Sequence, residues 1–229
     1  SDVIIIPDFP WPYTICLDSL RIPQLYKDRV KIGGFILERK PEDVRGSEEV
    51  RKEAGASETD KLIYAAISGP IQEKIPLIKM LEPILERFPR DIKVVMSTGN
   101  PKRGSDPVKS GSLTVIPWVE DRYKYLKAAD AIICRGGHNT IMQSICYSKP
   151  SIIIPTPNHT EQYANARRAK ELGFAEAIHQ DDVNRGMLLR LIDMLTSNPE
   201  YDDRFNKINA MGFTDGIENT LEAIAGLLL

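Results

Sequence analysis

The sequence predicts an α/β fold, in which a parallel β-sheet carries helices on both faces. From residue 61 onward, short β-branched runs alternate with glycine or proline turns and helical stretches, and this order is typical of a parallel sheet. Several runs are apolar throughout, as expected of strands that are covered on both faces. The 229 residues, 42% of them apolar, can also bury the core that such a sheet needs.

The elements follow one another in a regular order. The strands are predicted at residues 61–67, 92–97, 113–116, 131–134, 151–154 and 174–178. The helices are predicted at residues 73–88, 121–129, 139–148, 160–172 and 182–196, and two more follow toward the C-terminus. Pro83 lies inside the first of these helices and should kink or shorten it.

The first part of the chain has a different character. Residues 2–23, "DVIIIPDFPWPYTICLDSLRIP", contain four prolines and one apolar run, which predicts a lone strand within a tail. Residues 46–60 are charged and dotted with glycine, so a helix followed by a linker is expected there. The chain opens with Ser-Asp and not with Met, and we therefore expect it to be part of a longer protein.

Composition excludes several classes of function. The formal net charge of -2 argues against a nucleic-acid partner, because proteins that bind nucleic acids usually carry a positively charged surface. Cys16, Cys134 and Cys146 show no Cys-x-x-Cys spacing, so neither a disulfide framework nor a zinc site is indicated, and a cytoplasmic location fits. The apolar runs are far shorter than the roughly 20 residues of a membrane-spanning helix. Any membrane contact is therefore expected to be peripheral.

A glycine turn between a strand and a helix is the first candidate site. In "ADAIICRGGHNT" an apolar strand ends at Cys134, Gly136 and Gly137 follow, and a helix begins near Asn139. Unpaired N–H groups and the helix dipole at such a start attract an anion, and the glycines let a ligand approach the backbone. The turn could equally be an ordinary capped one, since Asn139 and Thr140 are residue types that cap helices.

A second helix start has the same local order of strand, turn and helix. It lies at Ser68-Gly69-Pro70, although this tripeptide also forms common turns. Two helix starts that face one cleft could hold a diphosphate without a metal. No Gly-x-Gly-x-x-Gly follows a predicted strand, which is evidence against a dinucleotide dehydrogenase.

A third cluster of polar residues follows the strand at 151–154. Glu161, Gln162 and Asn165 fall near the start of the next helix, at the carboxyl end of the sheet, where open α/β sheets bind ligands. A carboxylate and two amides supply the donors and acceptors that neutral sugar hydroxyls need. The same residues would also suit a capped, solvated helix start.

Together these segments resemble the donor-binding C-terminal domain of GT-B glycosyltransferases, and most closely glycosyltransferase family 28, the family of MurG. The likeness is carried by "WVEDRYKYLKAADAIICRGGHNTIMQ" and "KPSIIIPTPNHTEQYANARRAKELG" and extends more loosely from residue 30 to the end. It implies a Rossmann-like sheet in a nucleotide-sugar-binding domain at residues 46–229. Residues 1–45 would be the end of an N-terminal domain and the hinge, with "DVIIIPDFP" as its last strand.

The resemblance implies a site for a UDP-sugar and no cofactor or metal. Val119 would meet the base through its backbone. Gln143 stands where the family usually has a glutamate that grips the ribose, and a charge-assisted hydrogen bond worth about 1 kcal/mol is lost with it. The implied nucleotide-binding and diphosphate-binding residues are Ser68, Gly69, Val119, Arg135, Gly136, Gly137, His138, Asn139, Thr140 and Gln143, and the implied sugar-binding residues are Glu161, Gln162 and Asn165.

The implied function is an inverting transfer of a sugar, N-acetylglucosamine by this resemblance, to an unidentified acceptor, with lipid-linked acceptors among the candidates. The family's catalytic base lies on the N-terminal domain, so His138 is not assigned as a base and a further domain or a partner subunit is expected. Two alternatives stay open: a nucleotide-sugar-binding subunit without catalysis, and an enzyme like UDP-N-acetylglucosamine 2-epimerase. The segment "RGGHNTIMQS" lacks the paired glutamates of that epimerase signature.

Overall fold

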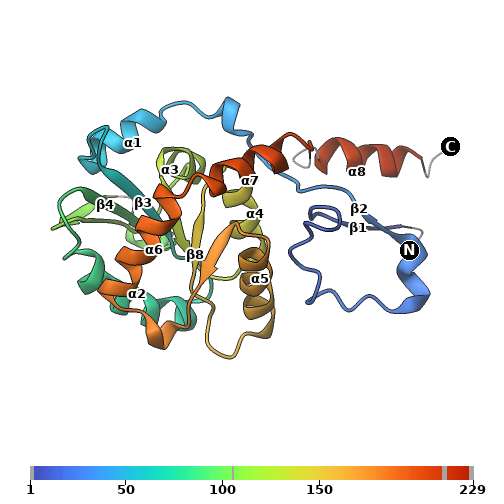
Figure 1. The fold of residues 1–229 in the computed structure, drawn as a ribbon, viewed down its shortest axis with the longest axis horizontal. Helices are drawn as coiled ribbons and strands as arrows, with labels where there is room; N and C mark the ends of the chain where they lie inside the picture. The colour runs from blue at the N-terminus through green and yellow to red at the C-terminus, as the bar shows by residue number, and fades with distance from the viewer. Residues whose placement is uncertain (1–2, 105, 213–215, 227–229) are drawn as a thin grey trace.

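The computed structural model describes residues 3–104, 106–212 and 216–226, and its centre is a twisted seven-stranded sheet (Figure 1). All neighbouring strands are parallel except β5, which runs antiparallel to β6 at one edge. The strand order is β5-β6-β4-β3-β7-β8-β9. The bounds are β3 Lys61–Ala66, β4 Ile92–Ser97, β5 Val108–Ser110, β6 Leu113–Ile116, β7 Ala131–Cys134, β8 Ser151–Ile153 and β9 Ala175–Ala177.

The predicted α/β class and its strands are confirmed. Largely apolar runs form the central strands β3, β4, β7 and β8, and their side chains are almost all buried. β5 was not predicted, because its three exposed residues carry no burial pattern. Short edge strands of this kind are common, because a long exposed edge could pair with strands of other molecules.

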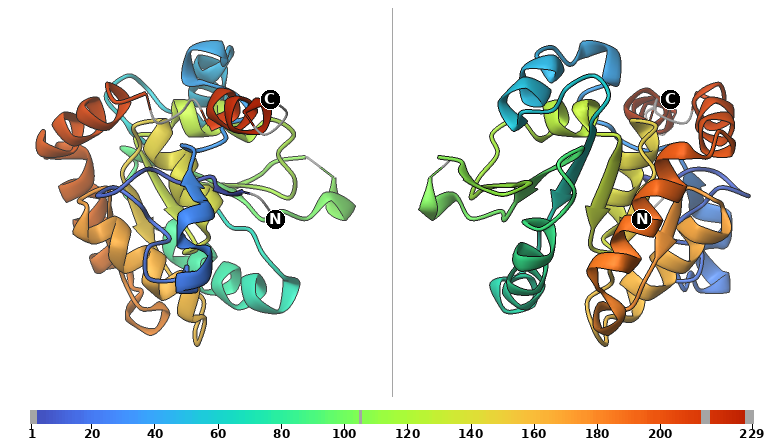
Figure 2. Two further views of the ribbon diagram at one scale, coloured as in Figure 1. Left: turned by 90° about the vertical axis from the view of Figure 1, so that its right-hand side faces the viewer. Right: turned by 60° about the vertical axis from the view of Figure 1, so that its left-hand side comes forward.

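Helices cover both faces of the sheet, as predicted. α2 and α6 lie on one face, and α3, α4 and α5 lie on the other (Figure 2). α2 ends at Leu85, shortly after Pro83 and earlier than predicted. The bounds are α1 Ser47–Ala54, α2 Ile71–Leu85, α3 Arg122–Ala128, α4 His138–Cys146, α5 Thr160–Glu171, α6 Arg185–Ser197, α7 Glu200–Asn209 and α8 Gly216–Ala225.

The chain changes direction across the sheet between β3 and β7. From β3 it proceeds to β4 and β6 on one side, whereas from β7 it proceeds to β8 and β9 on the other. The two strands are direct neighbours, with Ala66 paired to Cys134 at their carboxyl ends. Because the following helices leave in opposite directions, a crevice opens at this point, and ligands bind in such crevices.

The N-terminal segment, residues 3–45, lies beside the sheet domain. It contains a two-stranded parallel pair, β1 (Ile4–Ile6) and β2 (Val30–Ile32). The first strand was predicted and the second was not. α8 runs alongside this segment (Figure 1), where Asn219 Nδ2 donates to Gly33 O at 2.7 Å. Leu227–Leu229, which belong to the predicted C-terminal helix, lie outside the described residues.

Within residues 3–104, 106–212 and 216–226, no helix has both the length and the apolar character needed to cross a lipid bilayer.

Candidate functional site

A cavity of about 340 Å³ opens at the carboxyl ends of β3 and β7. Residues that precede α2 and residues that begin α4 line it together, although these segments are far apart in the sequence. The predicted nucleotide-binding residues in its lining are Ser68, Val119, Asn139, Thr140 and Gln143. The rest of the lining, which sequence reasoning did not identify, is Tyr64, Ala66, Ile67, Ser97, Gly99, Trp118, Arg122 and Leu126.

The start of α4 presents backbone donors at this cavity. Its hydrogen-bond ladder begins with Ile141 N–H, which donates to Gly137 O at 3.3 Å. The N–H groups of His138, Asn139 and Thr140 precede that bond and have no carbonyl partner in the helix. Since the helix dipole adds a partial positive charge at the same place, the first turn of α4 is suited to an anion.

The two glycines of the turn have different surroundings. A Cβ on Gly136 would lie 2.4 Å from Gln162 O, so only glycine fits there. A Cβ on Gly137 would meet no atom within 4 Å. Gly136 is therefore required by packing, and Gly137 leaves open space at the helix start for a ligand.

Ser68, in the turn that follows β3, lines the same cavity, whereas its neighbour Gly69 is not part of the lining. Gly69 has a φ of +112°, a region that side chains disfavour, so glycine is needed for the backbone to turn into α2. A Cβ there would also meet no atom within 4 Å. Behind the turn, the buried Lys74 donates to Gly99 O at 2.7 Å.

Arg135 lies beneath the turn and not in the lining of the cavity. Its guanidinium donates to the carbonyl oxygens of Glu73 (2.8 Å) and Ile154 (3.1 Å) and to Gln180 Oε1 (2.8 Å). The side chain thereby ties the first turn of α2 to the end of β8. Burial lowers the pKa of this guanidinium, and its charge remains in place because an arginine stays protonated near neutral pH.

The predicted sugar-binding residues separate into two groups. Glu161 is exposed and lines a second cavity of about 630 Å³, which His138 and the N-terminal segment also line. Gln162 Oε1 accepts from the N–H groups of Gly136 (3.2 Å) and Thr156 (2.9 Å). Asn165 is fully buried and donates to Gly136 O at 3.1 Å. These two amides hold the glycine turn in shape, and their contact with a sugar stays a prediction.

Gln143 is buried in α4, and its Nε2 donates to the hydroxyl of Tyr123 at 3.5 Å. The same hydroxyl donates to Glu38 Oε2 at 3.1 Å. The amide at this predicted ribose position is thus linked to a carboxylate of the N-terminal segment through one tyrosine.

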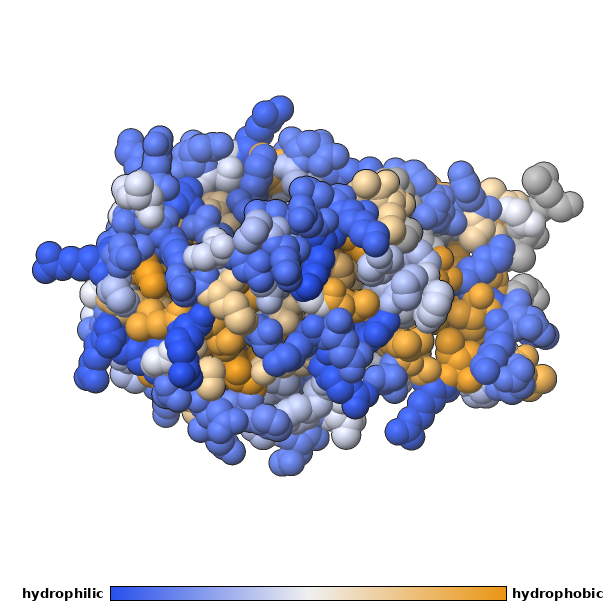
Figure 3. Space-filling view, in the orientation of Figure 1, coloured by the Kyte–Doolittle hydropathy of each residue, from blue (hydrophilic) through white to orange (hydrophobic). Residues whose placement is uncertain are grey.

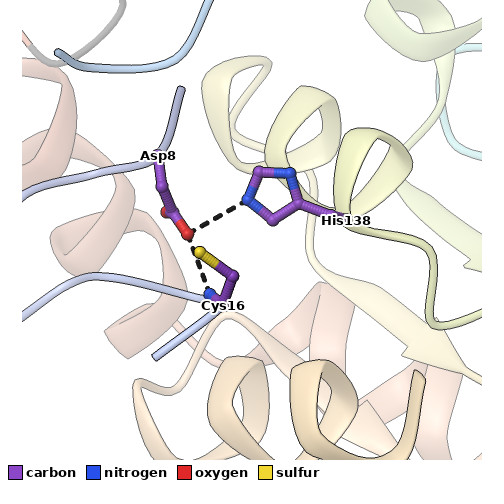
Figure 4. A group of neighbouring side chains, drawn as sticks. All are labelled: Asp8, Cys16 and His138. Atoms are coloured by element: carbon purple, nitrogen blue, oxygen red, sulfur yellow. Dashed lines mark hydrogen bonds and ion pairs between the residues drawn. The ribbon is translucent and has the colours of Figure 1, made fainter. Parts of the chain in front are cut away.

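Sequence reasoning missed Asp8, which the fold brings to His138 (Figure 4). Asp8 has no exposed surface, and its carboxylate accepts from His138 Nε2 at 3.1 Å and from the N–H of Cys16 at 2.8 Å. Burial acts to raise the pKa of Asp8, but these hydrogen bonds outweigh it and the pKa lies below its ordinary value. Asp8 directly follows the predicted strand and Pro7, which was the only signal available.

Residues 60–220 match the family model described as "Glycosyltransferase family 28 C-terminal domain". The chain belongs to glycosyltransferase family 28. The match includes both turns that line the 340 Å³ cavity and the whole of α5. The predicted family and the predicted fold are therefore confirmed, while the boundary at residue 46 stays a prediction.

Individual relatives agree with the family assignment. An uncharacterized glycosyltransferase of Methanosarcina acetivorans is 31% identical over 182 residues, which are 78% of this chain and 44% of that protein. A UDP-N-acetylglucosamine–N-acetylmuramyl-(pentapeptide) pyrophosphoryl-undecaprenol N-acetylglucosamine transferase of Lactobacillus delbrueckii subsp. bulgaricus is 25% identical over 154 residues, or 63% of this chain and 42% of that protein. This family 28 chain thus spans about half the length of the curated relatives it matches.

A solved structure shares the fold of this family 28 chain. The calicheamicin glycosyltransferase CalG4 has a TM-score of 0.65 at 12% identity, over 98% of this chain and 52% of that one. At this identity the likeness concerns the fold alone.

Proposed function

We propose that this chain is the donor-binding half of a glycosyltransferase that takes a sugar from a UDP-sugar. The observation that carries the proposal is the cavity between β3 and β7, into which the turn before α2 and the first turn of α4 both open. Backbone N–H groups and a helix dipole at one end of a crevice suit a diphosphate. The family membership supports the same ligand class.

The nucleotide would lie along this cavity. Its diphosphate would be held by the first turn of α4, with Thr140 donating its hydroxyl and Ser68 closing from the other side. The uracil would lie near Trp118 and Val119, which also line the cavity. Lys74 and Arg135 lie buried behind the two turns and, among the described residues, neither has a carboxylate within ion-pair distance. Their charges would favour the diphosphate without a metal or another cofactor.

The transferred sugar would enter the neighbouring 630 Å³ cavity, where Glu161 is available to accept from its hydroxyls. An acceptor hydroxyl would attack the anomeric carbon while the bond from that carbon to the diphosphate breaks. UDP would leave with the electron pair, and the helix start would stabilise its growing negative charge. The hydroxyl proton would pass to a base on the other half of the protein.

The name of one relative suggests which sugar and which acceptor this chain serves. N-acetylglucosamine is the proposed sugar, because a relative that is 25% identical over 63% of this chain is named as an N-acetylglucosamine transferase that uses UDP-N-acetylglucosamine. That name also gives a pyrophosphoryl-undecaprenol acceptor, so a lipid-linked acceptor is the candidate to test first.

Features of the N-terminal segment support the proposal that a further domain or a partner subunit packs against it. Among the described residues, β1 and β2 form a parallel pair with one partner strand each, and parallel strands are normally buried inside larger sheets. Apolar side chains gather over this part of the molecule (Figure 3), and Trp11 and Leu25 are 76% and 79% exposed. We propose that a preceding domain or a partner subunit covers them.

Calorimetric titration with UDP, UDP-N-acetylglucosamine, UDP-glucose and dTDP tests the donor. Thr140→Val should weaken UDP binding about tenfold or more, since a hydrogen bond to a charged group contributes about 1.5–3 kcal/mol. Thr196→Val is the matched control, because Thr196 also lies in a helix, where it donates to Ile192 O, and does not line the cavity. Equal affinity in wild type and Thr140→Val would refute the placement of the diphosphate.

The transferase activity is tested on a longer protein that includes the proposed second half. Release of UDP by the longer protein, and not by this chain alone, is the expected result. Binding of the UDP-sugar by the longer protein without transfer or hydrolysis would instead favour a nucleotide-sugar-binding subunit.

A further inference from the structure

His138 belongs to the start of α4, but its side chain reaches into the N-terminal segment. The ring nitrogen Nε2 lies 3.1 Å from Asp8 Oδ2, and the ring packs edge-on against the buried Phe35, with centroids 6.2 Å apart. Asp8 follows β1 and Phe35 follows β2. His138, a residue of the proposed donor site, is therefore held by the segment that follows β1 and by the segment that follows β2.

Asp8 in turn organises the loop that follows β1. Its carboxylate accepts from the N–H groups of Phe9 (2.6 Å), Ile15 (3.1 Å) and Cys16 (2.8 Å). The loop from residue 9 to residue 16 thus closes around one buried carboxylate, and His138 is the side chain that joins this carboxylate to α4 (Figure 4).

A metal ion is the other interpretation of this cluster, since ligand atoms of Asp8, Cys16 and His138 lie within 4.8 Å of one another. The backbone N–H groups argue against it. They direct partial positive charge at both carboxylate oxygens, where a cation would have to bind. The geometry is that of a hydrogen-bonded anion within the protein.

The two residues that follow His138, Asn139 and Thr140, line the nucleotide cavity, whereas His138 lines the larger cavity. The first turn of α4 therefore has the N-terminal segment on one side and the proposed diphosphate on the other. A shift of His138 would move the backbone N–H groups next to it, because they belong to the same helical turn.

We propose that His138 is a positioning residue: by its bond to Asp8 it fixes the first turn of α4 for the diphosphate and couples donor binding to the loop at residues 9–16. This inference rests on the proposed function. Coupling between two sites is reciprocal, so UDP should order the loop as much as the ordered loop strengthens the binding of UDP.

Titration of the chain with UDP tests the coupling through Asp8, which is remote from the nucleotide cavity. Asp8→Asn should weaken UDP binding about fivefold or more, the lower end for coupled sites. In a His138→Phe background the same change should have no further effect, because the two residues act through one bond. His138→Gln, which keeps an N–H donor, should retain most of the affinity, and His179→Gln is the matched control.

Hydrogen exchange gives a second measurement of the coupling, in the wild-type chain and in His138→Phe. Saturating UDP should slow exchange of the amides at residues 9, 15 and 16, which donate to Asp8, and His138→Phe should abolish this protection. A direct contact between His138 and the diphosphate, with no coupling, would leave the UDP affinity of Asp8→Asn unchanged.

The outcomes separate this inference from the proposed function. If the wild-type chain binds no UDP, the proposed function fails and the coupling fails with it. If the wild-type chain binds UDP, but Asp8→Asn binds it equally tightly and exchange at residues 9–16 is unaffected, the coupling alone is refuted.

Discussion

Substitution by alanine should lower the stability of the fold at one of the two glycines before α4 and leave it nearly unchanged at the other. In Gly136→Ala the new Cβ would lie 2.4 Å from Gln162 O and 2.7 Å from Gln162 Cβ. The shorter approach must lengthen by about 0.6 Å to reach 3.0 Å, below which real contacts essentially do not occur. Since the neighbouring atoms belong to the backbone and stem of α5, the helix or the turn must move.

The expected cost combines two effects. Overpacking of a tight interior costs about 1–3 kcal/mol, and the movement weakens the bonds that Gly136 makes with Gln162 and Asn165, each worth about 1 kcal/mol. A loss of about 3 kcal/mol corresponds to a fall in Tm of about 6–12 °C for a domain of this size. Urea unfolding measures the loss of free energy of unfolding, and differential scanning calorimetry measures the fall in Tm.

Gly137→Ala is the matched control for stability. Its Cβ meets open space and its φ is -70°, which alanine adopts freely, so the free energy of unfolding should change by less than about 1 kcal/mol. UDP affinity should fall nonetheless, because the methyl group projects at the helix start where the ligand would approach. Equal stability losses in the two variants, or a Gly136→Ala variant as stable as wild type, would refute this account of the turn.

Two further predictions concern buried polar groups. Asn165→Ala should lower the free energy of unfolding by about 1–3 kcal/mol, because it leaves Gly136 O without its donor; an unchanged urea midpoint would contradict that. The lowered pKa of Asp8 means that its carboxylate stabilises the fold above the unfolded-state pKa of about 3.9, and that this stability is lost as pH falls through the folded-state pKa. Asp8→Asn should therefore be less stable than wild type at pH 7, with a difference that narrows below about pH 4 in urea titrations; a constant difference would exclude the linkage.

Local sequence was sufficient for the class of fold and for most element positions. The largely apolar runs at 61–66, 92–97 and 131–134 can be buried on both faces only as central strands, and they form strands at the predicted places. The glycines and the Asn-Thr pair indicated a helix start with open backbone, which is a property of a few consecutive residues. Short exposed strands such as β5 have no such local signature, and were missed.

Only the tertiary structure decided which of these features meet. β3 and β7 are neighbours because the chain reverses its direction across the sheet, and this reversal places the turn after residue 67 beside the turn after residue 134. Folding likewise directs Gln162 and Asn165 inward onto Gly136 and brings Asp8 to His138. The physical reason is the separation of these residues along the sequence. Helix and strand propensity and hydrophobic periodicity depend on residues close together in the chain. The contacts described here join distant residues and form only once the sheet has fixed the order of its strands.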